Sequence, residues 1–173
     1  EAGYCTGSGL GAISSALLGL LNQGDHVVAS DTLYGGTWAM LAEFFPQKCG
    51  ITTTFVDVND PVAVAEACTD RTKVVYCESL SNPTLRVTNI PALAQVAHAH
   101  GAQLMVDNTF TPLAMTPLEH GADVVVHSLT KFVNGASDFI AGAVCGTTEF
   151  ISSLMDLHVG PLMILGPTMD PQV

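Results

Sequence analysis

Short apolar runs alternate with segments of helical periodicity along most of this 173-residue chain. The strand candidates cover residues 26–30, 51–56, 73–78, 103–107, 123–127 and 140–145. The helix candidates cover residues 10–22, 37–45, 61–68, 89–100 and 148–157. This alternation predicts an α/β fold with a mostly parallel sheet and helices on both faces. The hydrophobic fraction of 48%, against 12% charged residues, agrees with strands that are buried on both sides.

Lys131 lies just after the apolar run 123–127, and Ser128 and Thr130 stand between them, so an amine and two hydroxyls gather at one strand end. Of the three lysines in the chain, only Lys131 has apolar sequence on both sides, because the run 139–145 follows as a second buried strand candidate. Such surroundings would remove solvent from the amine, lower its pKa and make it available as a nucleophile or base. The structural alternative is a lysine that snorkels to the surface at a strand end.

Asp107 ends another short apolar run, residues 103–107. If this strand and the strand before Lys131 belong to one parallel sheet, Asp107 and Lys131 emerge at the carboxyl edge, where open α/β folds bind ligands. A pyridoxal phosphate enzyme needs a lysine that forms a Schiff base and an acid that keeps the pyridine nitrogen protonated. Asp107 can be that acid, and the structural alternative is an Asx turn or a helix cap after the strand.

The glycine-rich segment 7–12 opens a helix candidate near the amino end of the chain. Small residues let backbone N–H groups approach an anion closely, and the helix dipole favours negative charge there, so the segment is a candidate phosphate site. Ser128 and Thr130 can add hydroxyl donors from the other side. Tyr34 follows the strand 26–30 and could stack on a flat cofactor, although by itself it fits a turn aromatic with a solvated hydroxyl.

A dinucleotide-binding oxidoreductase is the main alternative. Gly7-x-Gly9-x-x-Ala12 fits a relaxed Rossmann fingerprint, and Asp31 follows the next strand at about the distance that the ribose contact requires. Against it, the six residues before Gly7 make a poor buried strand, and the lysine and aspartate at the later strand ends are left without a role. A non-catalytic α/β interaction module is a third possibility, in which every polar residue at a strand end is a turn or a cap.

Five segments, in their order along the chain, resemble the signatures of the Cys/Met-metabolism (trans-sulfuration) pyridoxal phosphate enzymes. They are Ser8-Gly9-Leu10, Leu33-Tyr34-Gly35-Gly36-Thr37, Glu78-Ser79-Leu80-Ser81-Asn82-Pro83-Thr84, Val106-Asp107-Asn108-Thr109 and His127-Ser128-Leu129-Thr130-Lys131. The family includes cystathionine γ-synthase, cystathionine γ-lyase, methionine γ-lyase and O-acetylhomoserine sulfhydrylase. The resemblance covers nearly the whole chain, and it implies the aspartate aminotransferase-like fold (fold type I). It also implies γ-elimination or γ-replacement on sulfur amino acids or activated homoserine.

The same resemblance implies a catalytic role for three residues. Lys131 would bind pyridoxal 5'-phosphate covalently, Asp107 would pair with the pyridinium nitrogen, and Tyr34 would stack on the ring and help to move protons. Asn82 matches a position near the ring hydroxyl of the cofactor. Glu78 matches a position that supports these contacts from behind.

The phosphate of the cofactor would be held by residues from two segments. The resemblance implies that Gly9 and Leu10 offer backbone N–H groups to it and that Ser128 and Thr130 offer hydroxyls. The complete set of cofactor-binding residues that we expect is Ser8, Gly9, Leu10, Tyr34, Glu78, Asn82, Asp107, Thr109, Ser128, Thr130 and Lys131. No metal site is expected, and the five cysteines include no Cys-x-x-Cys pair that would indicate zinc.

Members of this family are considerably longer than 173 residues. We therefore expect residues 1–173 to form a truncated part of the cofactor-binding large domain, without the amino-terminal segment and the carboxyl-terminal domain. By resemblance we also expect a cytoplasmic enzyme that is a homo-oligomer, a dimer of dimers, and acts on a small amino acid. The formal net charge of −11 argues against nucleic acid or an anionic membrane as a partner.

Overall fold

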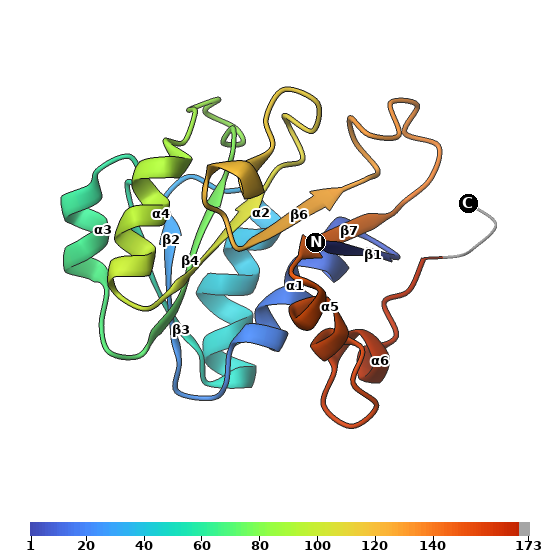
Figure 1. Ribbon diagram of the computed structural model, residues 1–173, viewed down its shortest axis with the longest axis horizontal. Helices are drawn as coiled ribbons and strands as arrows, with labels where there is room; N and C mark the ends of the chain where they lie inside the picture. Colours follow the sequence, from blue (N-terminus) through green and yellow to red (C-terminus); the bar gives the residue numbers. More distant parts are fainter. Residues whose placement is uncertain (170–173) are drawn as a thin grey trace.

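The chain folds around one seven-stranded sheet with helices on both faces (Figure 1). This computed structural model describes residues 1–169. The strands are β1 (Ala2–Thr6), β2 (His26–Ser30), β3 (Thr52–Val56), β4 (Thr72–Glu78), β5 (Gln103–Asp107), β6 (Val124–Ser128) and β7 (Gly142–Gly146). The α-helices are α1 (Gly9–Leu20), α2 (Gly35–Ala39), α3 (Pro61–Ala67), α4 (Ile90–Ala99), α5 (Thr148–Leu154) and α6 (Pro161–Leu165). A π-helical segment, η1 (Met40–Cys49), continues α2, and a short 3₁₀ helix, η2 (Pro117–His120), precedes β6.

The sheet has the strand order β1-β7-β6-β5-β4-β2-β3. Five neighbouring strands, β6, β5, β4, β2 and β3, are mutually parallel. In contrast, β7 is antiparallel to β6, and β1 is antiparallel to β7. The predicted mostly parallel α/β architecture is therefore confirmed. In this register Glu78 of β4 lies opposite Asp107 of β5, and Asp107 lies opposite Val126 of β6, so the carboxyl ends of three strands meet at one edge.

Residues 1–6 were predicted to make a poor buried strand, and Ala2–Thr6 form β1, an edge strand with alternating exposure that pairs only with β7. One local prediction was wrong. The run 139–145 was expected to be a buried strand from its start, but β7 begins at Gly142 and Ile140 is 68% exposed.

The helix after β2 also extends farther than its predicted end. The helix was predicted over residues 37–45. The helix instead passes Pro46 as the π-helical segment η1 and ends at Cys49, where Gly50 caps it in a left-handed conformation at φ 67°. Pro46 therefore lies inside the helix without donating a backbone hydrogen bond. Neither η2 nor α6 was predicted.

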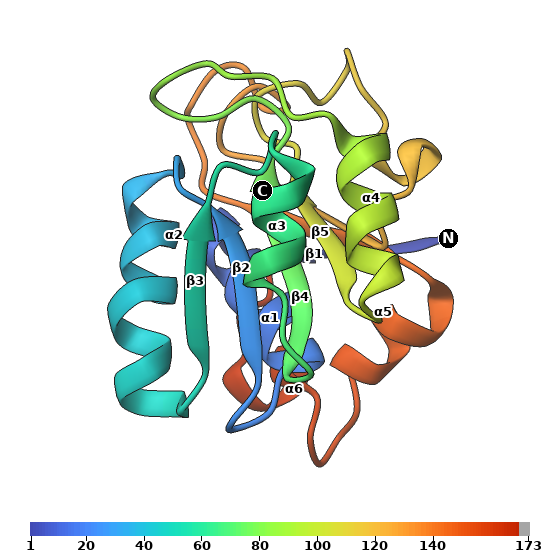
Figure 2. The same ribbon diagram turned by 90° about the vertical axis from the view of Figure 1, so that its left-hand side faces the viewer.

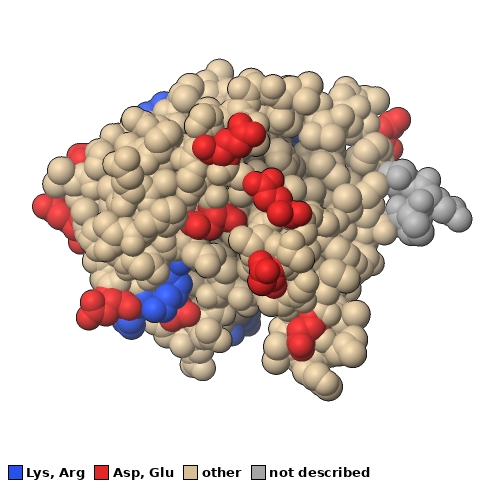
Figure 3. Space-filling view, in the orientation of Figure 1, with Lys and Arg blue, Asp and Glu red and all other residues tan. Residues whose placement is uncertain are grey.

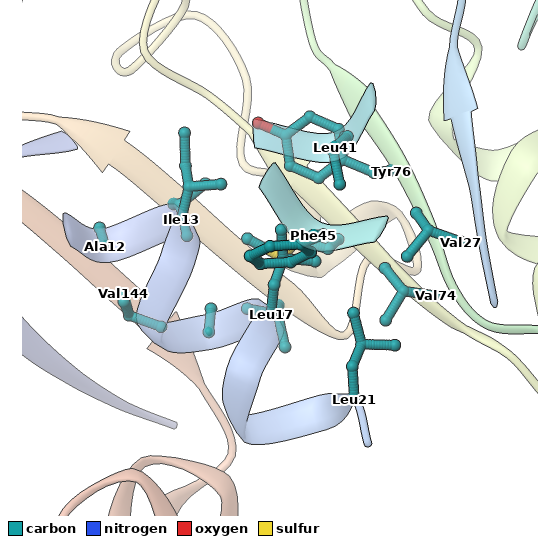
Figure 4. Close-up of a cluster of buried hydrophobic side chains, with 14 of the residues drawn as sticks. Ala12, Ile13, Leu17, Leu21, Val27, Leu41, Phe45, Val74, Tyr76 and Val144 are labelled. Carbon is teal, nitrogen blue, oxygen red and sulfur yellow. The ribbon is translucent and has the colours of Figure 1, made fainter. Parts of the chain in front are cut away.

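Two apolar clusters hold the helices to the sheet. One lies between the sheet and α1, η1 and α5, and Figure 4 shows part of it, with Leu17 of α1 and Phe45 of η1 packed against Val74 of β4. The other lies under α3 and α4 on the opposite face. Figure 2 shows α3 in front of the sheet and α1 behind it. Apolar residues on both faces of the central strands explain why those strands appear as continuous apolar runs in the sequence.

Acidic side chains are spread over the face shown in Figure 3, and lysine and arginine side chains are few there. This distribution reflects 16 acidic against 5 basic residues in the sequence. Within residues 1–169, none of the helices is both long enough and apolar enough to cross a lipid bilayer.

His26 links three strands from inside the sheet, and it predicts a pH dependence of stability. Its Nδ1 lies 2.8 Å from Thr72 Oγ1 and its Nε2 lies 2.9 Å from Thr54 Oγ1, and the residue is 6% exposed. Burial is the main cause that lowers the pKa of His26 below its ordinary value of 6.5. The unfolded chain therefore binds a proton more readily, so the stabilising contribution of neutral His26 is complete above that value and is lost as the pH falls below it.

We expect urea midpoints of the full-length protein to fall between pH 7.5 and pH 5.5, and to fall less in His26→Gln than in the unsubstituted protein. His158→Gln, which changes an exposed histidine, serves as the control and should keep the original slope. Parallel slopes in all three proteins would contradict the assignment to His26.

Candidate active site

A cavity of about 690 Å³ opens where β4, β5 and β6 end and α1 begins. All eleven residues predicted for the site line it, although they come from five separate segments of the sequence. They are Ser8, Gly9, Leu10, Tyr34, Glu78, Asn82, Asp107, Thr109, Ser128, Thr130 and Lys131. The carboxyl ends of the parallel strands therefore converge as the sequence predicts.

Asp107 is held at the floor of the cavity by Thr109. The backbone N–H of Thr109 donates to Asp107 Oδ1 at 2.9 Å, and its hydroxyl donates to the same oxygen at 2.6 Å. The Thr109 hydroxyl in turn accepts a hydrogen bond from the N–H of Ser128 at 2.8 Å, which joins the ends of β5 and β6. Burial raises the pKa of Asp107, and the hydrogen bonds from Thr109 oppose that shift. Oδ1 thus accepts two hydrogen bonds, and Oδ2 is the oxygen left for a further donor.

Lys131 lies in the turn that follows β6, where its N–H donates to Ser128 O at 3.2 Å and its own carbonyl accepts from Gly135 N at 2.8 Å. The side chain lines the cavity, but it is exposed. The prediction that the Lys131 amine is shielded from solvent is therefore wrong. The reason is that the apolar residues after Lys131 form an open loop rather than a buried strand.

Glu78 fixes the two segments that flank the cavity. Its Oε1 accepts from the N–H of Tyr34 at 2.8 Å, and its Oε2 accepts from the N–H of Asn82 at 2.7 Å. Burial raises the pKa of Glu78 to about 7, the neighbouring charge of Asp107 adds to this shift, and the two hydrogen bonds oppose it. One carboxyl group thus holds the backbones of two residues that line the cavity, Tyr34 and Asn82.

The amino end of α1 forms one wall of the cavity. Ser8 caps the helix, because its hydroxyl oxygen accepts from Gly11 N at 2.9 Å, and so its own proton remains available to an anion. The N–H groups of Gly9 and Leu10 are in the first turn, where they have no partner within the helix. The Thr130 hydroxyl, in contrast, donates to the carbonyl of Ala141 at 3.1 Å, so its proton is already used.

Gly9 allows α1 and β6 to meet, and it gives a prediction. A Cβ atom at residue 9 would lie 2.6 Å from Ser128 Cβ and 2.9 Å from Ser128 Oγ. Gly9→Ala should therefore push the helix end away from Ser128 and weaken cofactor binding by at least about 10-fold, since displacements of about 1 Å in a site are costly. The control is Gly35→Ala, where the added methyl meets open space. Equal dissociation constants for the two variants, measured by fluorescence titration, would contradict this role of Gly9.

Several residues that line the cavity were not predicted. They are Ile13, Leu80, Phe110, Phe132, Gly135, Ser137 and Ile140. Phe110 and Phe132 directly follow the predicted Thr109 and Lys131, and their ring centroids lie 5.2 Å apart in a tilted arrangement. The signal that could have identified these two phenylalanines is an aromatic residue immediately after a predicted site residue at a strand end.

The dinucleotide-binding alternative does not fit this structure. A Rossmann fold places the strand before its glycine motif beside the strand that carries the ribose-binding acid, and parallel to it. Here β1 is an antiparallel edge strand, and β2, which precedes Asp31, lies near the opposite edge. Asp31 is exposed and does not line the cavity. In residues 1–169, no three His, Cys, Asp or Glu side chains are grouped to hold a metal ion.

The chain is similar to several characterised enzymes. Methionine gamma-lyase from Arabidopsis thaliana is 54% identical over 174 residues, which cover 100% of this chain and 40% of that protein. Canavanine gamma-lyase from Pseudomonas canavaninivorans is 41% identical, with 99% of this chain and 42% of that protein covered. Cystathionine beta-lyase from Bacillus subtilis is 47% identical over 141 residues, which cover 81% of this chain and 36% of that protein.

The structural comparison agrees. The crystal structure of cystathionine gamma-lyase from Lactobacillus plantarum complexed with L-serine matches with a TM-score of 0.90 and 35% identity, covering 99% of this chain and 44% of that chain. The chain thus spans less than half the length of these proteins. The sequence model described as Cys/Met metabolism PLP-dependent enzyme matches residues 1–172. The chain therefore belongs to the Cys/Met-metabolism family of pyridoxal-phosphate-dependent enzymes.

Proposed function

We propose that this protein is a pyridoxal-phosphate-dependent lyase that eliminates the γ-substituent of a sulfur amino acid such as methionine. The observation that carries the proposal is the convergence of Lys131, Asp107 and Tyr34, from three separate segments, on one cavity. The similarity to enzymes named methionine gamma-lyase and canavanine gamma-lyase supports elimination at the γ-position. The 54% identity to the first of these favours a thioether substrate.

The polar groups of the cavity fit the cofactor in chemistry. A phosphate would be bound by the free N–H groups of Gly9 and Leu10 at the positive end of α1, together with the hydroxyls of Ser8 and Ser128. Asp107 presents a carboxylate oxygen that can accept a hydrogen bond from the N–H of a pyridinium ring. Thr130 holds the loop after β6 in place, and it contributes to phosphate binding only if its hydroxyl leaves Ala141.

The remaining groups are suited to orienting a flat ring. Tyr34 is half exposed, and its ring lies so close to Gly36 that a Cβ there would be 2.7 Å from Tyr34 Cε1. Asn82 is held by Glu78 and can bond a ring hydroxyl through its amide. Apolar side chains, among them Leu10 and Phe110, line the same space and suit a thioether chain.

The chemistry divides among three side chains. Pyridoxal phosphate, when bound, supplies an aldehyde for the amine of the amino acid and a ring that draws electrons from Cα. The Lys131 amine would hold the cofactor and then take the proton from Cα. Asp107 would keep the ring nitrogen protonated. The Tyr34 hydroxyl would give a proton to the departing thiolate, and hydrolysis would complete the conversion of methionine and water to methanethiol, ammonia and 2-oxobutanoate.

The proposal is tested on the full-length protein loaded with pyridoxal phosphate. Borohydride reduction followed by peptide mapping should find the cofactor fixed to Lys131. The loaded protein should release thiol, ammonia and 2-oxo acid from methionine in equal amounts. Cofactor on another lysine, or on none, would overturn the proposal. Turnover only when O-acetylhomoserine and a thiol are supplied together would replace elimination with γ-replacement.

A further inference from the structure

Tyr76 is the largest fully buried side chain described in this structure, and its hydroxyl makes no hydrogen bond of acceptable geometry within residues 1–169. The hydroxyl of Thr37, which is also fully buried, has none either. Buried hydroxyl groups without partners are disfavoured, so each calls for an explanation. Figure 4 shows the Tyr76 hydroxyl directed away from Val27 and Val74, at the end of the ring opposite those residues.

The sheet register brings this hydroxyl to the underside of the cavity. Tyr76 lies opposite Met105, and Glu78 lies opposite Asp107, in the parallel pairing of β4 with β5. Alternate residues of a strand point to the same face, so Tyr76 and Asp107 share the face that α1 covers. The two groups also affect each other, because the Asp107 charge raises the pKa of Tyr76 while the Tyr76 hydroxyl lowers that of Asp107. The Thr37 hydroxyl likewise lowers the pKa of Tyr76.

Asp107 needs donors if it is to remain charged where it lies. Thr109 supplies two, and both go to Oδ1. Among residues 1–169, the groups whose pKa the Asp107 charge raises are Tyr76, Cys77 and Glu78, all of β4, and none of them is a cation. A phenol below the carboxylate is then the donor that would favour its charged form from the core.

We propose that Tyr76 is a positioning residue of the site, whose hydroxyl donates to Asp107 from inside the core while the Thr37 hydroxyl donates to Tyr76. This inference rests on the proposed function, in which a charged Asp107 holds the proton of the cofactor ring nitrogen. Two buried hydroxyls without partners then become a short relay, Thr37 to Tyr76 to Asp107. The relay acts through Asp107, and Tyr76 itself does not touch the substrate.

The test is Tyr76→Phe in the full-length holoenzyme, because phenylalanine keeps the ring in the core and removes only the hydroxyl. Pyridoxal phosphate should remain bound to Lys131, but its dissociation constant should rise by about 10-fold, as expected for the loss of one hydrogen bond to a charged group. The ¹⁵N chemical shift of labelled cofactor should move toward that of an unprotonated ring nitrogen. In kinetics, kcat should fall while KM changes little. Thr37→Val should shift these quantities in the same direction.

Tyr4→Phe is the matched control, since Tyr4 lies in β1 against the same apolar cluster and outside the cavity. It should leave the dissociation constant and the ¹⁵N shift unchanged. In an Asp107→Asn background, Tyr76→Phe should have no further effect on the ¹⁵N shift. If Tyr76→Phe behaves as the control does and only raises the melting temperature, Tyr76 is an ordinary core residue. A wild-type protein without cofactor on Lys131 would instead refute the proposed function.

Discussion

Replacing Lys131 with alanine in the full-length protein is expected to remove the covalent bond to pyridoxal phosphate and to lower turnover by roughly 10³-fold or more. The loss is large because one amine serves both as the attachment of the cofactor and as the base that takes the Cα proton. The fold should be unaffected, since the exposed Lys131 side chain lies in a turn and packs into neither apolar cluster. Absorbance before and after borohydride measures the first effect, and release of 2-oxo acid measures the second.

One further substitution separates the role of the Lys131 amine from that of its charge, and another serves as a control. Lys131→Arg keeps a cation at the cavity but offers no comparable nucleophile, so it should be as inactive as the alanine variant. Lys48→Ala removes an exposed lysine at the end of η1, outside the cavity, and should change nothing. Turnover at the wild-type rate in either Lys131 variant would show that another residue performs the chemistry.

The position of the cavity could be predicted because strand ends are visible in a sequence of this kind. Asp107 and Ser128 each stand where an apolar run gives way to polar residues, and parallel strands deliver such residues to the same edge. The strand order itself could not be deduced from those runs. Local pattern also made the 7–12 segment and Tyr34 candidates for the same cofactor, and the family resemblance added Asn82 and Glu78.

Predictions failed where local composition and tertiary context disagree. The residues after Lys131 are apolar and suggested burial, but they form the open loop at the cavity mouth, where Ile140 is exposed. Likewise, the helix predicted to end at residue 45 continues past Pro46 as a π-helical segment. In both places the outcome is decided by packing against distant segments, which a local pattern does not contain.

The contacts that hold the site residues in place could not be predicted from local sequence pattern either. Glu78 accepts hydrogen bonds from Tyr34, 44 residues earlier in the chain, and from Asn82, four residues later. The resemblance gave Glu78 a supporting position without its partners. In the sequence, Tyr76 looks like an ordinary apolar core residue of a strand. Only the register of β4 with β5 brings it under Asp107.

Asp107→Asn is expected to have the second largest effect on activity. An amide keeps the shape of the carboxylate but cannot carry the negative charge that holds the proton on the ring nitrogen. Without that proton the ring accepts electrons from Cα poorly, so kcat should fall on the order of 10²-fold, the magnitude typical for loss of one electrostatic contact in an active site. The covalent bond at Lys131 should survive, which distinguishes this variant from Lys131→Ala. Asp31→Asn is the control, since Asp31 is exposed and outside the cavity.

In the cofactor-free protein, the same substitution should increase stability, although it lowers the activity of the loaded enzyme. Burial raises the pKa of Asp107 above its ordinary value, so its charged form opposes folding, and its contribution to stability declines as the pH rises through the folded pKa. Asp107→Asn removes that charge, and it should therefore raise the melting temperature of the cofactor-free protein at neutral pH and flatten its dependence on pH. A variant that loses activity while it gains stability identifies a charge kept for function. If Asp107→Asn lowers stability and leaves kcat unchanged, Asp107 serves only to cap the end of β5 through Thr109.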